Sequence, residues 1–332
     1  MKTRWMSMLC AAGLFALSLA SSAQVQELKF ATQNPKGHPL VTGMERFAEL
    51  VSQKSGGAMK VNLFPGGVLG SDQANVSALQ GGTLDIVVLN SGILASQVKE
   101  FGVYDFPFMF ATTAEADAVV DGSFGRTMHD KLRAKDIVGL AYWELGFREI
   151  TNSRRPVNAV QDIAGLKLRV IPNAINVDWV KALGANPTPL PFPEVYAALD
   201  QRAIDGQENP VSVISANKFY EVQKYIVLSN HQYNPQSLIF SKKVWDTLTP
   251  ANQKILMDAA VEAGKYQRQV ARDAAGTALD NLKKNGMQVT ELAPPELAKF
   301  RDAMKPVVAK HSEIVGADVV NALQAELAKA RK

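Results

Sequence analysis

The sequence predicts an α/β protein of two domains, with a hinged cleft between the domains and one long helix that spans both. Three observations lead to this fold class: strands alternate with helices, the alternation restarts halfway along the chain, and a long helical stripe follows residue 249. Alternating strands and helices are typical of a mainly parallel sheet. The chain length of 332 residues favours two domains.

The first half of the chain carries the first series of strands. They are expected at 28–32, 59–64, 84–89 and 137–143, and a helix opening near Pro39 follows the first of them. The run 84–89 is almost wholly apolar, as a strand buried on both faces requires.

The second half repeats this alternation, with strands expected at 147–152, 166–170 and 225–229. No low-complexity linker separates the halves, so we expect several strand crossings between the domains instead of one tether. The expected boundaries are residues 24–145 plus 235–274 for domain I, and residues 146–234 plus 275–332 for domain II.

The long helix is predicted from its start signal and its apolar spacing. Thr249 is a suitable N-cap and Pro250 suits the first helical position, and apolar residues then recur at helical spacing until Gly286. At 1.5 Å per residue such a helix is on the order of 50 Å long. The alternative is two helices broken at Gly264 or Gly276. A helix bracing both domains favours hinge closure around a ligand.

Residues 1–23 have the pattern of a secretory signal peptide. Lys2 and Arg4 precede a largely apolar run at 6–20, and small residues end the segment at Ala23. The run is too short for a membrane span, and a retained anchor helix is the alternative. The only cysteine, Cys10, lies in this segment. We therefore expect export, with no disulfide in the remaining chain.

Charge and motifs exclude several classes of function. The formal net charge is +4, or +2 without Lys2 and Arg4, which is too small to indicate a nucleic-acid partner. The sequence has no G-x-S-x-G, P-loop, G-x-G-x-x-G or H-E-x-x-H motif, so we expect no enzyme activity and no cofactor. The four histidines do not fall at metal-ligand spacings, so no metal is expected.

Arg169 is the most informative single residue. It closes the apolar strand 166–170, just before a proline and a helical run. A guanidinium there keeps its charge and needs an anion, and its planar fork fits a carboxylate with two bonds. No carboxylate nearby in sequence is an obvious partner. We therefore predict a ligand that is a small organic acid, although a structural ion pair is the alternative.

Three more residues in the same half point to a site when they are taken together. Arg148 lies where the chain is expected to cross between domains, and Phe192 lies in a proline-stiffened loop. Asn209 precedes Pro210, so it is either a ligand contact or a helix N-cap. By themselves, an arginine is usually a surface residue and a phenylalanine is usually a core residue.

Six segments occur in an order that resembles a known family, and they are 148–152, 165–170, 184–189, 194–199, 205–210 and 218–225. The series is similar to the extracytoplasmic solute-binding subunit of tripartite ATP-independent periplasmic (TRAP) transporters, of the dicarboxylate and sialic-acid type. The resemblance covers essentially the whole chain after residue 23.

The resemblance implies the periplasmic binding protein fold, a location in the periplasm, and delivery of a captured carboxylate to an integral membrane permease. A monomer is expected. The resemblance gives Arg169 the role of the selectivity arginine, bound to the ligand carboxylate through two bonds. It implies a second arginine at Arg148, polar contacts at Asn209 and Asn173, and an aromatic wall at Phe192.

The residues of domain I bear on which acid is bound. Sialic-acid binders carry a glutamate where this chain has Asn90 and an asparagine near Gln33, whereas Asp72 is retained. Asn90 is either a turn residue or a neutral partner for ligand hydroxyls. With Gln33, His38 and Asp72 as further partners, the pocket suits a hydroxylated monocarboxylate, with a sugar acid of the uronate kind preferred. A C4-dicarboxylate or sialic acid, a ligand-reporting role beside a membrane sensor, and a periplasmic lyase are the alternatives.

Overall fold

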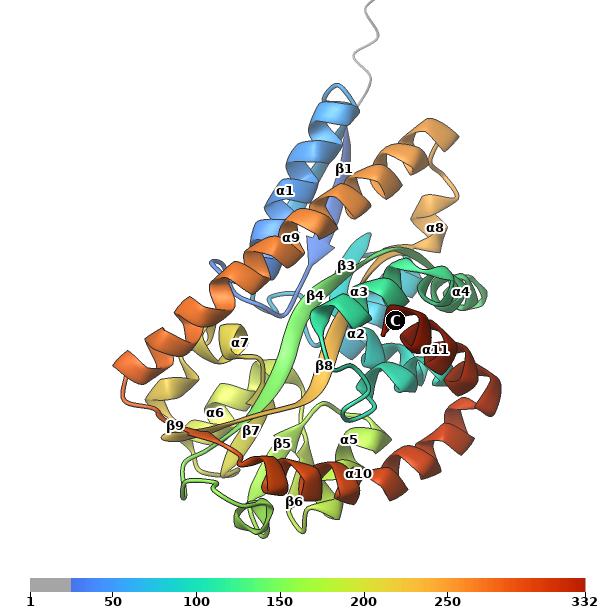
Figure 1. The fold of residues 1–332 in the computed structure, drawn as a ribbon. Coiled ribbons are helices and arrows are strands. Elements are labelled where there is room, and N and C mark those ends of the chain that lie inside the picture. The colour runs from blue at the N-terminus through green and yellow to red at the C-terminus, as the bar shows by residue number, and fades with distance from the viewer. Residues whose placement is uncertain (1–24, 332) are drawn as a thin grey trace, which may run out of the picture.

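The computed structural model describes residues 25–331, so the predicted signal peptide at 1–23 lies outside the described residues. Figure 1 shows the fold. Its strands are β1 (Gln26–Ala31), β2 (Met59–Phe64), β3 (Ile86–Asn90), β4 (Ile137–Asn152), β5 (Lys167–Val170), β6 (Asn186–Pro189), β7 (Gly206–Asn209), β8 (Tyr225–Ser241) and β9 (Gln288–Glu291).

The helices cover the chain between and after these strands. They are α1 (Pro39–Lys54), α2 (Asp72–Gly81), α3 (Thr113–Asp121), α4 (Ser123–Leu132), α5 (Ala174–Ala182), α6 (Val195–Asp200), α7 (Val211–Ala216), α8 (Lys242–Trp245), α9 (Pro250–Lys284), α10 (Pro294–Val315) and α11 (Ala317–Ala330). The short 3-10 helices η1 (Ser91–Ser96) and η2 (Lys99–Asp105) follow β3. None of the helices within residues 25–331 has both the length and the apolar character of a membrane span.

The strands form one sheet in the order β2-β1-β3-β8-β4-β7-β5-β6, and β9 pairs with β8. The outer parts are parallel, as predicted: β1 pairs with β2 and β3, and β5 pairs with β6 and β7. The centre is antiparallel, because β8 runs against both β3 and β4. We call the part around β1–β3 the first lobe and the part around β5–β7 the second lobe.

Two long strands cross from one lobe to the other. The separate strands expected at 137–143 and 147–152 are one strand, β4, and the strand expected at 225–229 continues to Ser241 as β8. The register of β4 against β8 shifts between Glu144 and Gly146, where Gly146 has a φ of 114°. This bulge interrupts the apolar pattern, which explains why the sequence suggests two strands.

The long helix α9 is continuous over 35 residues, or on the order of 50 Å, and crosses both lobes (Figure 1). Its start is as predicted, since the Thr249 side chain accepts from the backbone N–H of Asn252. The alternative of two helices broken at a glycine is wrong. At Gly264, a Cβ atom would lie 2.8 Å from Cδ1 of Trp143, so this glycine allows α9 to approach β4 closely.

Polar bonds fix α9 to β4 beside the bulge. The Gln267 amide accepts from the Glu144 N–H at 2.8 Å and donates to the Glu144 carbonyl at 2.7 Å. The Trp143 indole donates to the Ala260 carbonyl at 3.1 Å. The helix therefore holds the crossing strand at the residue where its register changes.

The domain boundaries expected from the sequence stay predictions. The last helix, α11, packs against α3, and Arg331 binds Glu115 of that helix at 3.0 Å. The end of the chain thus lies on the first-lobe side, beyond α10 (Figure 1).

Candidate functional site

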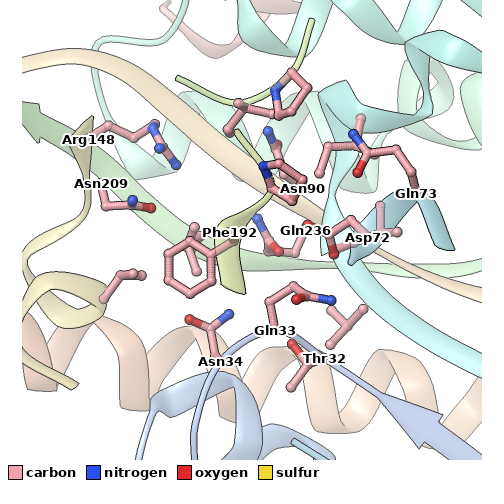
Figure 2. A pocket seen from close by; sticks show the side chains of 18 of the residues that line it. Thr32, Gln33, Asn34, Asp72, Gln73, Asn90, Arg148, Phe192, Asn209 and Gln236 are labelled. Atoms are coloured by element: carbon pink, nitrogen blue, oxygen red, sulfur yellow. The ribbon is translucent and has the colours of Figure 1, made fainter. Parts of the chain in front are cut away.

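A cavity lies between the lobes, at the carboxyl ends of several strands. Residues of both lobes line it (Figure 2). They are Thr32, Gln33, Asn34, Asp72, Gln73, Val88, Leu89, Asn90, Ile93, Leu145, Arg148, Arg169, Ile171, Pro172, Pro191, Phe192, Asn209, Val213 and Gln236.

The cavity brings together most of the residues that the sequence singles out, and leaves two outside. Those that line it are Arg169, Arg148, Asn209, Phe192, Asn90, Asp72 and Gln33. Asn173 and His38 do not line it.

Arg169 presents a buried cation to the cavity. Its side chain is enclosed, with 2% of the residue exposed, and Nε donates to the Leu190 carbonyl at 2.8 Å. Nη1 has no hydrogen-bond partner among the described residues. Burial lowers the pKa of Arg169 to about 10, partly opposed by Glu208 and Asp72, so the group stays charged at neutral pH. Its Cζ lies 5.7 Å from the centre of the Phe192 ring.

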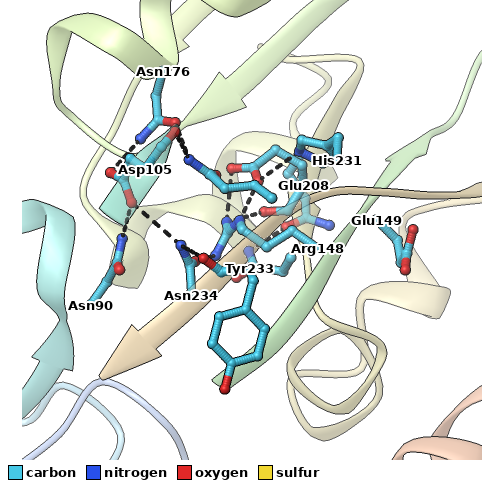
Figure 3. Close-up of polar contacts among 12 residues, drawn as sticks. Asn90, Asp105, Arg148, Glu149, Asn176, Glu208, His231, Tyr233 and Asn234 are labelled. Carbon is cyan, nitrogen blue, oxygen red and sulfur yellow. Dashed lines mark hydrogen bonds and ion pairs between the residues drawn. The ribbon is translucent and has the colours of Figure 1, made fainter. Parts of the chain in front are cut away.

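Arg148 also reaches the cavity wall, but its charge is already matched. It binds Glu208 through Nε and through Nη2, the latter at 2.7 Å, and Nη1 donates to Asn234 at 2.6 Å (Figure 3). Although burial alone would raise it, Arg148 and His231 hold the pKa of Glu208 at about 2. A direct contact between Arg148 and the ligand stays a prediction.

The first-lobe wall presents oxygen atoms that have no hydrogen-bond partner within residues 25–331. They are Thr32 Oγ1, Gln33 Oε1, Asn34 Oδ1 and Asp72 Oδ1. Leaving buried acceptors unpaired is costly, so this wall favours a ligand with several donors. Burial raises the pKa of Asp72 to about 7, and this is opposed by Arg169 and Gln33. Gln236 Nε2, an amide donor that has no hydrogen-bond partner in the described part of the chain, also lines the cavity.

Asn90 and Asn209 have internal partners as well as a place in the wall. Asn90 caps η1, with Oδ1 accepting from the Gly92 N–H at 3.4 Å, so it is a turn residue and a cavity residue at once. The amide of Asn209 donates to Gln207 at 2.5 Å. The N-cap of α7 is Pro210, and the capping alternative for Asn209 is therefore wrong.

The two predicted site residues outside the cavity are helix caps. Asn173 Oδ1 accepts from the Asn176 N–H at the start of α5, and its amide donates to Asp105. His38 Nδ1 accepts from the Leu40 N–H at 3.1 Å at the start of α1. Burial lowers the pKa of His38 to about 3, so its ring is neutral. Ligand contacts from these two residues stay predictions, which their geometry does not support.

Several lining residues are missing from the sequence prediction. Thr32 and Asn34 flank Gln33 just after β1, and the carboxyl end of a strand in an open α/β sheet is a signal that could have found them. Gln73 follows Asp72 at the start of α2. Gln236 lies in the part of β8 that was not expected to be a strand, so no signal pointed to it. No cluster suited to a metal ion occurs within residues 25–331.

The chain matches known proteins in sequence and in fold. The family model "Bacterial extracellular solute-binding protein, family 7" matches residues 30–313. The 2,3-diketo-L-gulonate-binding periplasmic protein YiaO of Escherichia coli K12 is 38% identical over 294 residues, which is 88% of each chain.

Two solved structures are similar over nearly the whole chain. The sugar acid binding protein DctPAm of Advenella mimigardefordensis, in complex with galactonate, has a TM-score of 0.91 and 39% identity, covering 92% of this chain and 99% of that one. A TRAP periplasmic solute binding protein of Ochrobactrum anthropi has a TM-score of 0.83 and 53% identity, covering 93% of this chain and 97% of that one.

Proposed function

Since the chain belongs to bacterial extracellular solute-binding protein family 7, we propose that it captures a polyhydroxylated monocarboxylate, a sugar acid, and delivers it to a TRAP permease. The resemblance to TRAP solute-binding subunits is confirmed. The family is periplasmic, and its members bind organic acids for transport and are not enzymes. The lyase alternative is therefore set aside.

The observation that carries the proposal is the Arg169 guanidinium opposite a wall of acceptor oxygens, because its Nη1 atom has no hydrogen-bond partner within residues 25–331. With Nε of Arg169 bound to Leu190, the terminal nitrogens remain for the ligand carboxylate, which they bind as charge-assisted donors. Hydroxyl groups on the rest of the ligand then donate to the oxygens of Thr32, Gln33 and Asp72. A sugar acid has this combination of one carboxylate and several hydroxyls.

The same arrangement opposes a C4-dicarboxylate. A second carboxylate reaching the first lobe would face acceptor oxygens and the carboxyl group of Asp72. Arg148 offers little compensation, because both oxygens of Glu208 already bind it. When Asp72 is ionised, the two like charges at close range are unfavourable in a buried site. The galactonate bound by the Advenella mimigardefordensis protein also supports a sugar acid.

A thermal-shift screen tests the ligand class. We expect D-galactonate, D-galacturonate or a related sugar acid to raise the melting temperature by several degrees at saturation, because a ligand stabilises the folded state by RT ln(1 + [L]/Kd). Succinate and sialic acid should give smaller shifts. A large shift with succinate and none with any sugar acid would contradict the proposal.

Delivery to a permease needs a separate test. Uptake of a labelled sugar acid should be measured in cells carrying a TRAP permease, with and without this chain. Uptake that depends on the chain is expected. Binding without uptake would favour the ligand-reporting alternative.

A further inference from the structure

Asp105, the last residue of η2, is a buried carboxylate held by side-chain amides from four directions. It is 0% exposed. Oδ1 accepts from Asn90 at 3.2 Å and from Asn234 at 3.3 Å. Oδ2 accepts from Asn176 at 3.0 Å and from Asn173. Figure 3 shows Asn90, Asn176 and Asn234 converging on this carboxylate.

The two oxygens of Asp105 bind different parts of the molecule. Asn90 ends β3 in the first lobe and lines the cavity, and Asn234 lies on the crossing strand β8. Asn173 and Asn176 belong to the start of α5 in the second lobe, directly after the cavity-lining segment 171–172. One carboxylate thus joins the wall of the first lobe to the helix that follows the wall of the second.

The surrounding sequence fits a carboxylate at this position. A Cβ atom on Gly92 would overlap the carboxylate of Asp105, so the glycine makes room for it. The Gln232 amide donates to the Asp105 backbone carbonyl and to Asn176 Oδ1. Asn234 Oδ1 accepts a hydrogen bond from Arg148, so Asn234 connects the Asp105 carboxylate to the Arg148–Glu208 pair.

We propose that Asp105 is a positioning residue that stabilises the closed arrangement of the lobes and so slows ligand release, without contacting the ligand. Burial raises the pKa of Asp105, and this is opposed by its amide partners and by Arg148. Each carboxylate oxygen accepts from two amide donors, an arrangement that favours the ionised form. Moving α5 away from β3 would break the bonds at one oxygen, and a buried charge that loses its partners is strongly unfavourable. Closure and the Asp105 bonds therefore support each other. The effect on ligand release rests on the proposed function, whereas the effect on closure does not.

Asp105→Asn is the direct test. In this variant an N–H₂ group replaces one acceptor oxygen. The two amide groups that donated to that oxygen lose their hydrogen bonds and face another donor instead. With D-galactonate as the probe, we expect the dissociation rate to rise at least about tenfold while the association rate changes by less than about twofold. Trp179 provides the stopped-flow fluorescence signal, because its indole donates to Asn176 Oδ1 at 3.0 Å.

A second variant keeps the test valid if Asp105→Asn does not fold. Asn173→Ser retains an N-cap residue for α5 but loses the amide that donates to Asp105. It should raise the dissociation rate in the same direction by a smaller factor. Asp178→Asn is the matched control, since this carboxylate also lies on α5 but binds Lys310 at 2.7 Å and His311 at 2.8 Å of α10. It should keep the wild-type rate.

Lobe separation in ligand-free protein distinguishes failure of this proposal from failure of the proposed function. Nitroxide labels are placed at the exposed positions Ser77 on α2 and Lys181 on α5. Pulsed electron paramagnetic resonance then measures the distance between the two labels, and so between the lobes. Asp105→Asn should shift the distribution to longer distances, even if no probe acid binds. Wild-type distances and dissociation rates in both Asp105→Asn and Asn173→Ser would overturn the proposal, as would an equal effect of Asp178→Asn.

Discussion

Glu208 binds the guanidinium of Arg148 through both carboxylate oxygens, inside the wall of the ligand cavity. The two charges match each other there, whereas Nη1 of Arg169 has no hydrogen-bond partner within residues 25–331. Under the proposed function, Arg169 is therefore the carboxylate position of the cavity, and the acceptor oxygens of the first lobe select the rest of the ligand.

Replacing Glu208 should destabilise the folded protein, because Arg148 then loses its ion-pair partner. Glu208→Gln leaves Arg148 buried without a counter-charge, and we expect the free energy of unfolding to fall by about 3–5 kcal/mol at pH 7. The pKa of Glu208 is held at about 2, below its value of about 4.3 in unfolded chains. The stabilisation that ionised Glu208 gives the folded state is therefore fully present above about pH 4.3 and is lost as pH falls towards 2. The difference from wild type should shrink as pH falls from about 5 towards 2. Urea denaturation at several pH values measures it.

Asp72→Asn should change which acids bind. The variant loses a charged acceptor for a ligand hydroxyl, so affinity for D-galactonate should fall by about 1.5–3 kcal/mol. Affinity for succinate should rise, because the carboxyl group facing a second carboxylate is gone. Calorimetric titration checks both, with the exposed Asp246→Asn as control. Unchanged preference between the two acids would argue against the role of Asp72.

The affinity for the ligand should depend on pH through the titration of Asp72. Burial raises the pKa of Asp72 to about 7 in the free protein. Ligand hydroxyls donate to its ionised form, so binding lowers this pKa, and linkage then requires affinity to increase with pH up to about 7 and to level off above it. Titrations of D-galactonate between pH 6 and 8 should show this increase in wild type. The increase should be absent in Asp72→Asn.

Two glycines of α9 provide a matched pair for the packing of this helix. Gly264→Ala places a Cβ atom 2.8 Å from the buried Trp143 and should lower the free energy of unfolding by about 1–3 kcal/mol. Gly276→Ala meets nothing within 4 Å and should raise it by about 0.5–1 kcal/mol, because alanine favours the helix. Urea denaturation compares them. Equal effects would mean that close contact with β4 does not require Gly264.

Local sequence signals predict much of the fold. The strand at 59–64 has the same bounds as β2, and the start of α9 at Pro250 follows from its cap and its proline. The continuity of β4 was missed because the bulge at Glu144–Gly146 interrupts its pattern. Pairing between distant strands decides such continuity, and a local pattern does not contain it.

The sequence predicts some residues of the site but not the contacts that depend on distant parts of the chain. Arg169 was found because a permanent charge at the end of a buried strand needs a partner. The sequence does not predict the pairing of Arg148 with Glu208, since 60 positions separate the two residues and the adjacency of β4 and β7 brings them together. His38 and Asn173 were expected in the site, but their side chains bind the first turns of helices.

Calorimetric titration of Arg169 variants with D-galactonate tests the central claim most directly. We expect Arg169→Ala to lose about 3–5 kcal/mol of binding, because a carboxylate would remain unpaired in the cavity. Arg169→Lys should also bind poorly, since a point charge does not replace the planar fork. Arg154→Ala, at an exposed arginine, should bind as wild type does. A folded Arg169→Ala variant that binds within tenfold of a galactonate-binding wild type would contradict the claim.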